Sequence, residues 1–130
     1  GGVIFYSLGN FIFETETTAV QPADAFQEQR LPMDMKVGAY MDNRSRNGTI
    51  GFPVMPNIWR AVMAGWTIED GKVTEVTLYP IDLGMKMSRG QRGLPRLSGD
   101  EDTLRYLQSL SEPFGTKIEI KDGVGMIHLS

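Results

Sequence analysis

Two Asp-Gly pairs limit the fold of this chain more than any other feature of its sequence. Asp70-Gly71 lies within residues 59–79 and Asp122-Gly123 lies within residues 116–129, and in both stretches the flanking apolar residues have the spacing of strands. Asp-Gly favours a two-residue hairpin turn, because that turn needs positive φ angles. We therefore predict two β-hairpins, over residues 59–79 and 116–129. Pro80 is expected to end regular pairing of the first, because proline has no N–H to donate.

A helical pattern lies between the two hairpins. Ser98 and Glu101 match the S-x-x-E capping box, and three leucines then follow at helical spacing. Pro113 is expected to stop the helix. We predict one clear helix near residues 99–111, which forms a unit with the C-terminal hairpin over residues 98–129.

The N-terminal end contains two short apolar runs. Residues 3–6 and 11–13 have the β-branched and aromatic composition of strands, and turn-forming residues separate them. We predict two short strands that flank a corner at Ser7, Gly9 and Asn10, or a single strand that carries a bulge there.

Residues 14–56 are the least regular part of the sequence. We expect one or two helical turns over residues 23–30, a strand near residues 35–41, a loop tip or hairpin turn at residues 44–48, and mobility elsewhere. Taken together, residues 1–130 are predicted to form an α+β fold with mostly antiparallel strands and one clear helix.

Composition excludes several classes of protein. Hydrophobic residues make up 41% of the 130 residues and charged residues 22%, which is ordinary for a folded domain. The net charge of −3 argues against nucleic-acid binding, which normally needs a basic surplus. The absence of cysteine removes disulfides, thiolate zinc sites, iron–sulfur clusters and cysteine nucleophiles. Because no apolar run reaches roughly 18–20 residues, we predict no membrane span in this chain.

Few side chains are candidates for chemistry. His128 is the single histidine and lacks the paired-histidine spacing of a zinc site, so we interpret it as a partly exposed strand residue. No serine lies in the G-x-S-x-G context of a nucleophile. Glu14 and Glu16 are a possible acid–base pair, whereas the acids at residues 100–102 favour a helix N-terminus. We predict no catalytic residue and no metal ligand in this chain.

A basic, Gly-rich loop precedes the predicted helix. It carries Arg89, Arg92 and Arg96, with Lys86 nearby. Guanidinium groups pair with carboxylates and phosphates in bidentate fashion, so the three arginines are candidate anion-binding residues. The alternative is a solvated loop whose charge is offset by the acids at the start of the helix.

The segment over residues 3–13 resembles a signature of the poly-gamma-glutamate capsule synthesis (CapA) family, a branch of the calcineurin-like metallophosphatase superfamily. It reads Val-Ile-Phe-Tyr-Ser-Leu-Gly-Asn-Phe-Ile-Phe, against I-x-Y-S-L-G-N-F-x-F in the family. Glu14 follows, where the family more often has Asp. Weaker similarities occur in the family's order at residues 59–83, 93–97 and 110–116.

The resemblance implies that residues 1–130 are the C-terminal portion of a CapA-like domain with a calcineurin-like layered α/β fold. The metal ligands of the family would lie upstream, so a divalent Mn, Fe or Zn ion would be bound by the missing N-terminal part of the same polypeptide. No cofactor is expected in this chain itself. Ser7, Gly9 and Asn10 would line the site, and the alternative is that they form a purely structural turn.

The implied function is a part in bacterial capsule or poly-gamma-glutamate biosynthesis. The resemblance also favours the cell envelope as the location of the protein. The complete protein would be metallophosphatase-like, and the fragment would not be catalytic. A second hypothesis is a non-enzymatic scaffold or binding module of the cell envelope, which uses the arginine loop to bind an anionic polymer such as polyglutamate.

Overall fold

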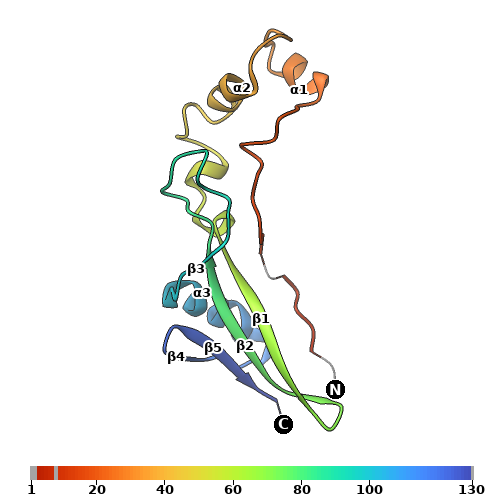
Figure 1. The fold of residues 1–130 in the computed structure, drawn as a ribbon, viewed down its shortest axis with the longest axis vertical. Coiled ribbons are helices and arrows are strands. Elements are labelled where there is room, and N and C mark those ends of the chain that lie inside the picture. Colours follow the sequence, from red (N-terminus) through yellow and green to blue (C-terminus); the bar gives the residue numbers. More distant parts are fainter. Residues whose placement is uncertain (1–2, 8, 130) are drawn as a thin grey trace.

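The computed structural model describes residues 3–7 and 9–129. The molecule is elongated, with a β-sheet and a helix at one end and two short helices at the other (Figure 1). Its elements are α1 (Ala23–Glu28), α2 (Val37–Arg44), the 3-10 turns η1 (Phe52–Val54) and η2 (Pro56–Ile58), β1 (Arg60–Glu69), β2 (Lys72–Asp82), β3 (Arg96–Leu97), α3 (Glu101–Ser111), the 3-10 turn η3 (Glu112–Phe114), β4 (Glu119–Lys121) and β5 (Val124–His128). The α+β prediction, with mostly antiparallel strands and a helix near residues 99–111, is confirmed.

Every strand pair in the sheet is antiparallel. The strand order is β1-β2-β5-β4, and β3 pairs with the C-terminal end of β2. Both predicted hairpins are present. Asp70 and Gly71 have φ angles of 50° and 74°, and Asp122 and Gly123 have φ angles of 52° and 76°. Two consecutive positive φ angles are those of a type I′ turn, so the Asp-Gly pairs specify the hairpins for the expected reason.

Pro80 does not end the first hairpin, and this expectation is wrong. Pro80 pairs with Val62, and the ladder continues until Arg60 lies opposite Asp82. The carbonyl of Pro80 accepts a hydrogen bond of 3.0 Å from the N–H of Ser98. In an antiparallel strand the N and O of one residue face the same neighbour. The missing N–H therefore faces Ser98, and the ladder with β1 loses no hydrogen bond.

The main core lies between α3 and one face of the sheet. Its buried members are Val62, Val76, Leu78, Leu104 and Ile118. β5 approaches the helix closely at Gly125, where a Cβ atom would lie 3.0 Å from Ile118 and 3.2 Å from Leu104. A larger residue at this position would displace the core. The helix itself ends at Ser111, before Pro113, as predicted.

α3 begins two residues later than a cap at Ser98 would require. Asp100 is the N-cap, and its carboxylate accepts hydrogen bonds from the N–H of Asp102 at 3.1 Å and from the hydroxyl of Thr103 at 2.6 Å. The Ser98 hydroxyl instead accepts from the N–H of Asp100 at 3.2 Å. The predicted capping box is therefore wrong. Asp caps a helix as well as Ser does, and here it lies directly before the first helical residue.

No strand forms in the described part of residues 3–13, so the two strands predicted there are wrong. The segment is irregular and runs beside the body (Figure 1). Val3 and Phe5 pack on the main core, and the N–H of Phe13 donates to the carbonyl of Gly93 at 3.0 Å. A strand needs a partner that accepts and donates along its length, and none of the described strands pairs with this segment.

Two short helices occupy part of residues 14–56. α1 confirms the helical turns predicted over residues 23–30. The strand predicted near residues 35–41 is wrong, because α2 begins at Val37. The helical spacing of α2 buries Tyr40 and Met41 against Phe26 in a small separate cluster, an arrangement that the alternation of a strand would break. The mobility expected for this region stays a prediction.

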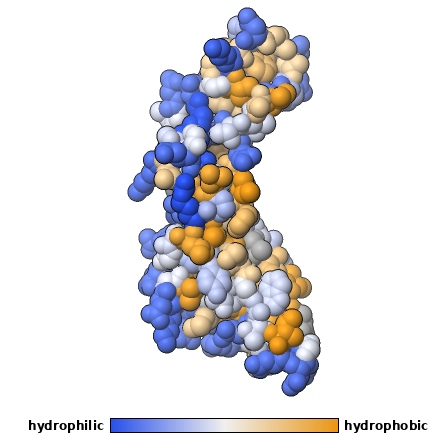
Figure 2. All heavy atoms as spheres, viewed as in Figure 1, coloured by the Kyte–Doolittle hydropathy of each residue, from blue (hydrophilic) through white to orange (hydrophobic). Residues whose placement is uncertain are grey.

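Within residues 3–7 and 9–129, no helix combines the length and the apolar character that crossing a membrane requires. Figure 2 shows apolar side chains exposed along the middle of the molecule and at the end that carries α1 and α2.

Candidate functional site

The corner at Ser7, Gly9 and Asn10 lies where the N-terminal segment meets the start of β1. Gly9 has a φ angle of 80°, and a Cβ atom on it would lie 3.1 Å from the carbonyl oxygen of Arg60 and 3.2 Å from Ala61. Its N–H donates to the hydroxyl of Ser7 at 3.3 Å. Both the backbone angle and the close approach to β1 therefore require glycine here.

Two of these three residues line a cavity of about 210 Å³ between the N-terminal segment, β1 and α3. Ser7 and Gly9 are in its wall, together with Asn57, Arg60 and Tyr106, whereas Asn10 is exposed and is not one of its lining residues. Ligand pockets usually measure about 300–1,000 Å³, so this cavity alone is small for a substrate. The role of the corner in lining an active site stays a prediction.

The three candidate anion-binding arginines do not converge on one site. Arg89 forms an ion pair with Asp42 and donates to the carbonyl of Gly38 at 3.3 Å, so it connects the loop to α2. Arg96 is exposed, and its Nη2 donates to the carbonyl of Gln91 at 3.2 Å. The guanidinium of Arg89 is thus already bound by a carboxylate, and that of Arg96 is bound by a neutral group.

Arg92 is the most enclosed of the three. It forms an ion pair with Glu16, in which Nη2 donates a hydrogen bond of 2.6 Å to Oε1, and its guanidinium lies 5.0 Å from the centre of the Trp59 ring. Glu16 is therefore bound to a cation and does not form an acid–base pair with Glu14, which is exposed. The ion pair fastens the N-terminal segment to the loop that follows β2.

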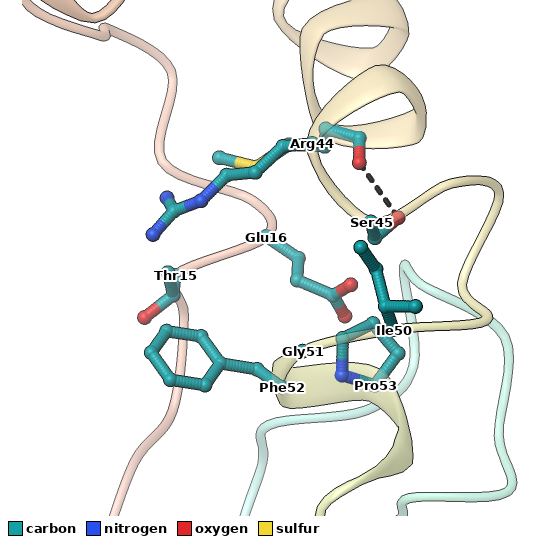
Figure 3. Close-up of a pocket in the computed structure, with 9 residues that line it drawn as sticks. Thr15, Glu16, Arg44, Ser45, Ile50, Gly51, Phe52 and Pro53 are labelled. Atoms are coloured by element: carbon teal, nitrogen blue, oxygen red, sulfur yellow. Dashed lines mark hydrogen bonds between the residues drawn. The ribbon is translucent and has the colours of Figure 1, made fainter.

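Figure 3 shows the small pocket beside Glu16, with Arg44 and Phe52 at its rim. Ser45 closes one side, and its hydroxyl donates to the carbonyl of Met41 at 2.7 Å. The cavity volume is about 100 Å³. That is room for a few water molecules and not for a substrate, so we assign this pocket a structural role.

A larger polar cleft opens between the start of β1, the turn after β2 and β3. Its volume is about 420 Å³, and it is lined by three cations and two carboxylates, which are Arg60, Lys86, Arg96, Asp82 and Asp100. Arg60 also lines the smaller cavity at the Ser7–Gly9 corner, so the two hollows adjoin. The size is within the range of ligand sites, and the cations make the cleft suited to an anion.

The electrostatics of the cleft are set partly by Asp100. The hydroxyl of Thr103, which donates to its carboxylate, is the main cause that lowers the pKa of Asp100 below its ordinary value. The backbone N–H groups of Asp102 and Thr103 and the charge of Arg60 lower this pKa further, and partial burial opposes them. Asp100 is therefore ionised at neutral pH, but its oxygens are engaged in capping α3.

Sequence reasoning identified Arg96 and Lys86 and missed Arg60, which completes the cleft. A signal was available in the first hairpin. Counting the ladder outward from the Asp70-Gly71 turn brings Arg60 to within one residue of Asp82, and the β-bulge between Thr67 and Ile68 supplies the shift that places the two residues opposite each other. The expectation that Pro80 ends the pairing hid this relationship.

His128 lies on the exposed side of β5, as interpreted from the sequence. Its Nδ1 is 3.4 Å from a carboxylate oxygen of Glu75, and its Nε2 is 3.8 Å from one of Glu119. Among the described residues, no group of three or more histidine, aspartate or glutamate side chains is arranged to hold a metal ion. We derive no metal-dependent step from the side chains of the described residues.

No model of a known protein family matches the chain. Two proteins of Sinorhizobium fredii (strain NBRC 101917 / NGR234), y4sH and y4uA, are each 38% identical to it over an alignment of 136 positions. Both are described as uncharacterized proteins, so they assign no activity. The alignment covers 97% of this chain and 29% of each relative. The chain thus spans less than a third of the length of the relatives that it matches.

Proposed function

We propose that this chain is the C-terminal portion of a CapA-like protein of bacterial capsule or poly-gamma-glutamate biosynthesis, metallophosphatase-like when complete and not catalytic by itself. The observation that carries the proposal is the exposure of apolar side chains in residues 3–13, the segment with the CapA-like motif. Four of its apolar side chains are exposed, Ile4 by 75%, Tyr6 by 80%, Phe11 by 54% and Ile12 by 53%, while Val3, Phe5 and Phe13 pack on the described core.

A segment of this composition is suited to a partner that covers it. Exposed apolar patches mark interaction surfaces, and the unpaired backbone of an extended segment is a template for strand addition. Gly9 and Phe13 lie against β1 and Gly93, and the side chains of Phe11 and Ile12 between these contacts are exposed. In the proposal, the remaining polypeptide pairs with this segment as a strand.

The partial coverage of the relatives supports the same proposal. Each relative is long enough to contain a further domain, because the aligned region covers only 29% of its length. Metal ligands for Mn, Fe or Zn would come from that further polypeptide, and such an ion would activate water against a phosphoester. Ser7 and Gly9 would contribute one wall beside Arg60, at the cavity that they already line.

The test compares the complete polypeptide that contains this chain with the 130-residue chain alone. Both are purified, their metal content is measured, and hydrolysis of bis(p-nitrophenyl) phosphate is followed with added Mn²⁺. We expect bound metal and hydrolysis in the complete polypeptide and neither in the chain alone. A complete, folded polypeptide without metal and without hydrolysis would contradict the proposal.

The second hypothesis, an anionic-polymer-binding module that uses Arg89, Arg92 and Arg96, stays a prediction. Replacing all three arginines with alanine would not test it cleanly, because the loss of Arg92 leaves the carboxylate of Glu16 buried and unpaired. A loss of polymer binding in that variant could therefore reflect unfolding. Any test of anion binding needs cations that do not hold the fold together.

A further inference from the structure

The polar cleft between β1, the turn after β2 and β3 contains cations that the fold does not neutralise. Within the described residues, no carboxylate lies within 4.0 Å of a side-chain nitrogen of Arg60, Lys86 or Arg96. Arg89 and Arg92, in the same loop region, each have such a partner. The cations of the cleft therefore keep hydrogen-bond donors for a ligand.

The two acids of the cleft are occupied by the backbone and by a hydroxyl. Asp82 accepts a hydrogen bond of 2.8 Å from the N–H of Gly84, which shapes the turn after β2. Asp100 accepts from the N–H of Asp102 and from the hydroxyl of Thr103. Both carboxylates thus serve the local structure, and the net charge of the five ionised side chains stays positive.

The turn after β2 and the loop that follows it position the side chain of Arg96. Gly84 has a φ angle of 75°, and a Cβ atom there would lie 3.1 Å from Nη1 of Arg96 and 2.8 Å from the sulfur of Met87. The carbonyl of Gln91 holds the Nη2 of Arg96. Glycine at position 84 therefore leaves room beside the turn for the side chains of Arg96 and Met87.

Arg60 and the apolar lining complete the arrangement. The guanidinium carbon of Arg60 lies 5.8 Å from the centre of the ring of Tyr106, a residue that lines the adjoining smaller cavity. Trp59 and Ile81 line the same cleft and are buried. Apolar walls beside unpaired cations strengthen the attraction for an anion, because they lower the local dielectric constant.

We infer that this cleft is a binding site for a multivalent oxyanion, a ligand that carries two or more carboxylate or phosphate groups. The three cations lie on three separate elements. A ligand with several negative groups can pair with all of them, whereas a ligand with one negative group cannot. Arginine binds both kinds of oxyanion in bidentate fashion, and lysine supplies a point charge. The inference does not depend on the CapA proposal, because it uses only residues of this chain and requires no metal and no catalysis.

The test uses two probes and two matched double variants. The 130-residue chain is titrated with inorganic tripolyphosphate and with citrate by isothermal calorimetry. The cleft variant is Lys86→Gln with Arg96→Gln, which are exposed side chains and leave Arg60 and its contact with Tyr106 in place. The control variant is Lys72→Gln with Lys121→Gln, which lowers the net charge equally at the two hairpin turns.

We expect the unmodified chain to bind at least one probe with a stoichiometry of one, and the cleft variant to bind at least about tenfold more weakly, as the loss of two charge-assisted contacts implies. The control variant should change the affinity by less than about twofold, which is the size of a screened long-range effect. Binding of only tripolyphosphate would identify phosphate as the ligand group, and binding of only citrate would identify carboxylate.

Two results would overturn the inference. One is that neither probe binds to the chain, whose folding is verified by circular dichroism in the same buffer. The other is that the control variant weakens binding as much as the cleft variant does, because the attraction would then be a property of the whole surface. Neither result would bear on the CapA proposal, which is tested by metal content and hydrolysis in the complete polypeptide.

Discussion

The carboxylate of Glu16 accepts a hydrogen bond from Nη2 of Arg92 and forms an ion pair with Nε, and only 8% of the Glu16 side chain and 13% of the Arg92 side chain are exposed. Trp59 packs against the same guanidinium. This contact joins three segments that are far apart in the sequence: the N-terminal segment, the residue before β1 and the loop after β2. It therefore joins the N-terminal segment to the rest of the chain, together with the contacts of Gly9 and Phe13.

Glu16→Gln should lower the free energy of unfolding by about 3–5 kcal/mol, because it leaves the Arg92 charge enclosed without its counter-ion. Urea unfolding followed by tryptophan fluorescence measures the change. Glu14→Gln is the matched control, since Glu14 is exposed, and it should change stability by less than about 0.5 kcal/mol. Equal effects of the two variants would show that the ion pair of Glu16 with Arg92 does not stabilise the fold.

Gly93→Ala should strongly destabilise the attachment of the N-terminal segment. Gly93 has a φ angle of 94°, and a Cβ atom there would overlap the carbonyl oxygen of Phe13. We expect a loss of more than about 1 kcal/mol, the usual size for alanine at a positive φ angle, with the steric overlap added. Thermal unfolding measures it.

Gly90→Ala is the control for this prediction. Its φ angle is not in the left-handed region, and no atom lies within 4 Å of a Cβ built there. It should leave stability unchanged or raise it slightly, because alanine has fewer unfolded conformations than glycine. If both variants behaved alike, the close approach of Phe13 to Gly93 would be refuted.

Asp100→Ala should cost about 1 kcal/mol, the usual contribution of a helix N-cap, while Asp100→Asn should cost much less because Asn also caps. The lowered pKa of Asp100 also sets a pH dependence. The folded state binds the proton less readily than the unfolded state, so this contribution is complete above about pH 4 and is lost as the pH falls through the lowered pKa.

Urea unfolding of the wild type and of Asp100→Asn at about pH 7 and about pH 3 tests the sign. The wild type should lose more stability on acidification than the variant does. A larger loss in the variant would mean that Thr103 and the helix N-terminus do not stabilise the ionised form of Asp100.

Local signals were sufficient for the hairpins and the long helix. Each Asp-Gly turn needs only its own two residues to have positive φ angles, and the leucines of α3 need only the period of a helix. The capping residue was misplaced because Ser98 and Asp100 are equally good caps by type. Choosing between them required the distance from Asp100 to the N–H of Asp102.

Non-local features could not be read from the sequence in the same way. Residues 3–6 and 11–13 have strand composition, but pairing depends on a partner strand, which the described sheet does not offer. α2 has few strong helix formers, and its burial against Phe26 decides its conformation. The binding of Arg92 by Glu16 joins residues 76 positions apart, and no spacing rule predicts such a pair.

We propose that residues 3–13 become a paired strand when the rest of the polypeptide is present. Hydrogen–deuterium exchange of the backbone amides tests it directly, in the complete polypeptide and in the 130-residue chain. We expect the amides of Ile4, Tyr6 and Ile12 to exchange fast in the chain alone and slowly in the complete polypeptide, and those of Val76 and Leu78 to exchange slowly in both. Fast exchange of the N-terminal amides in the complete polypeptide would contradict it.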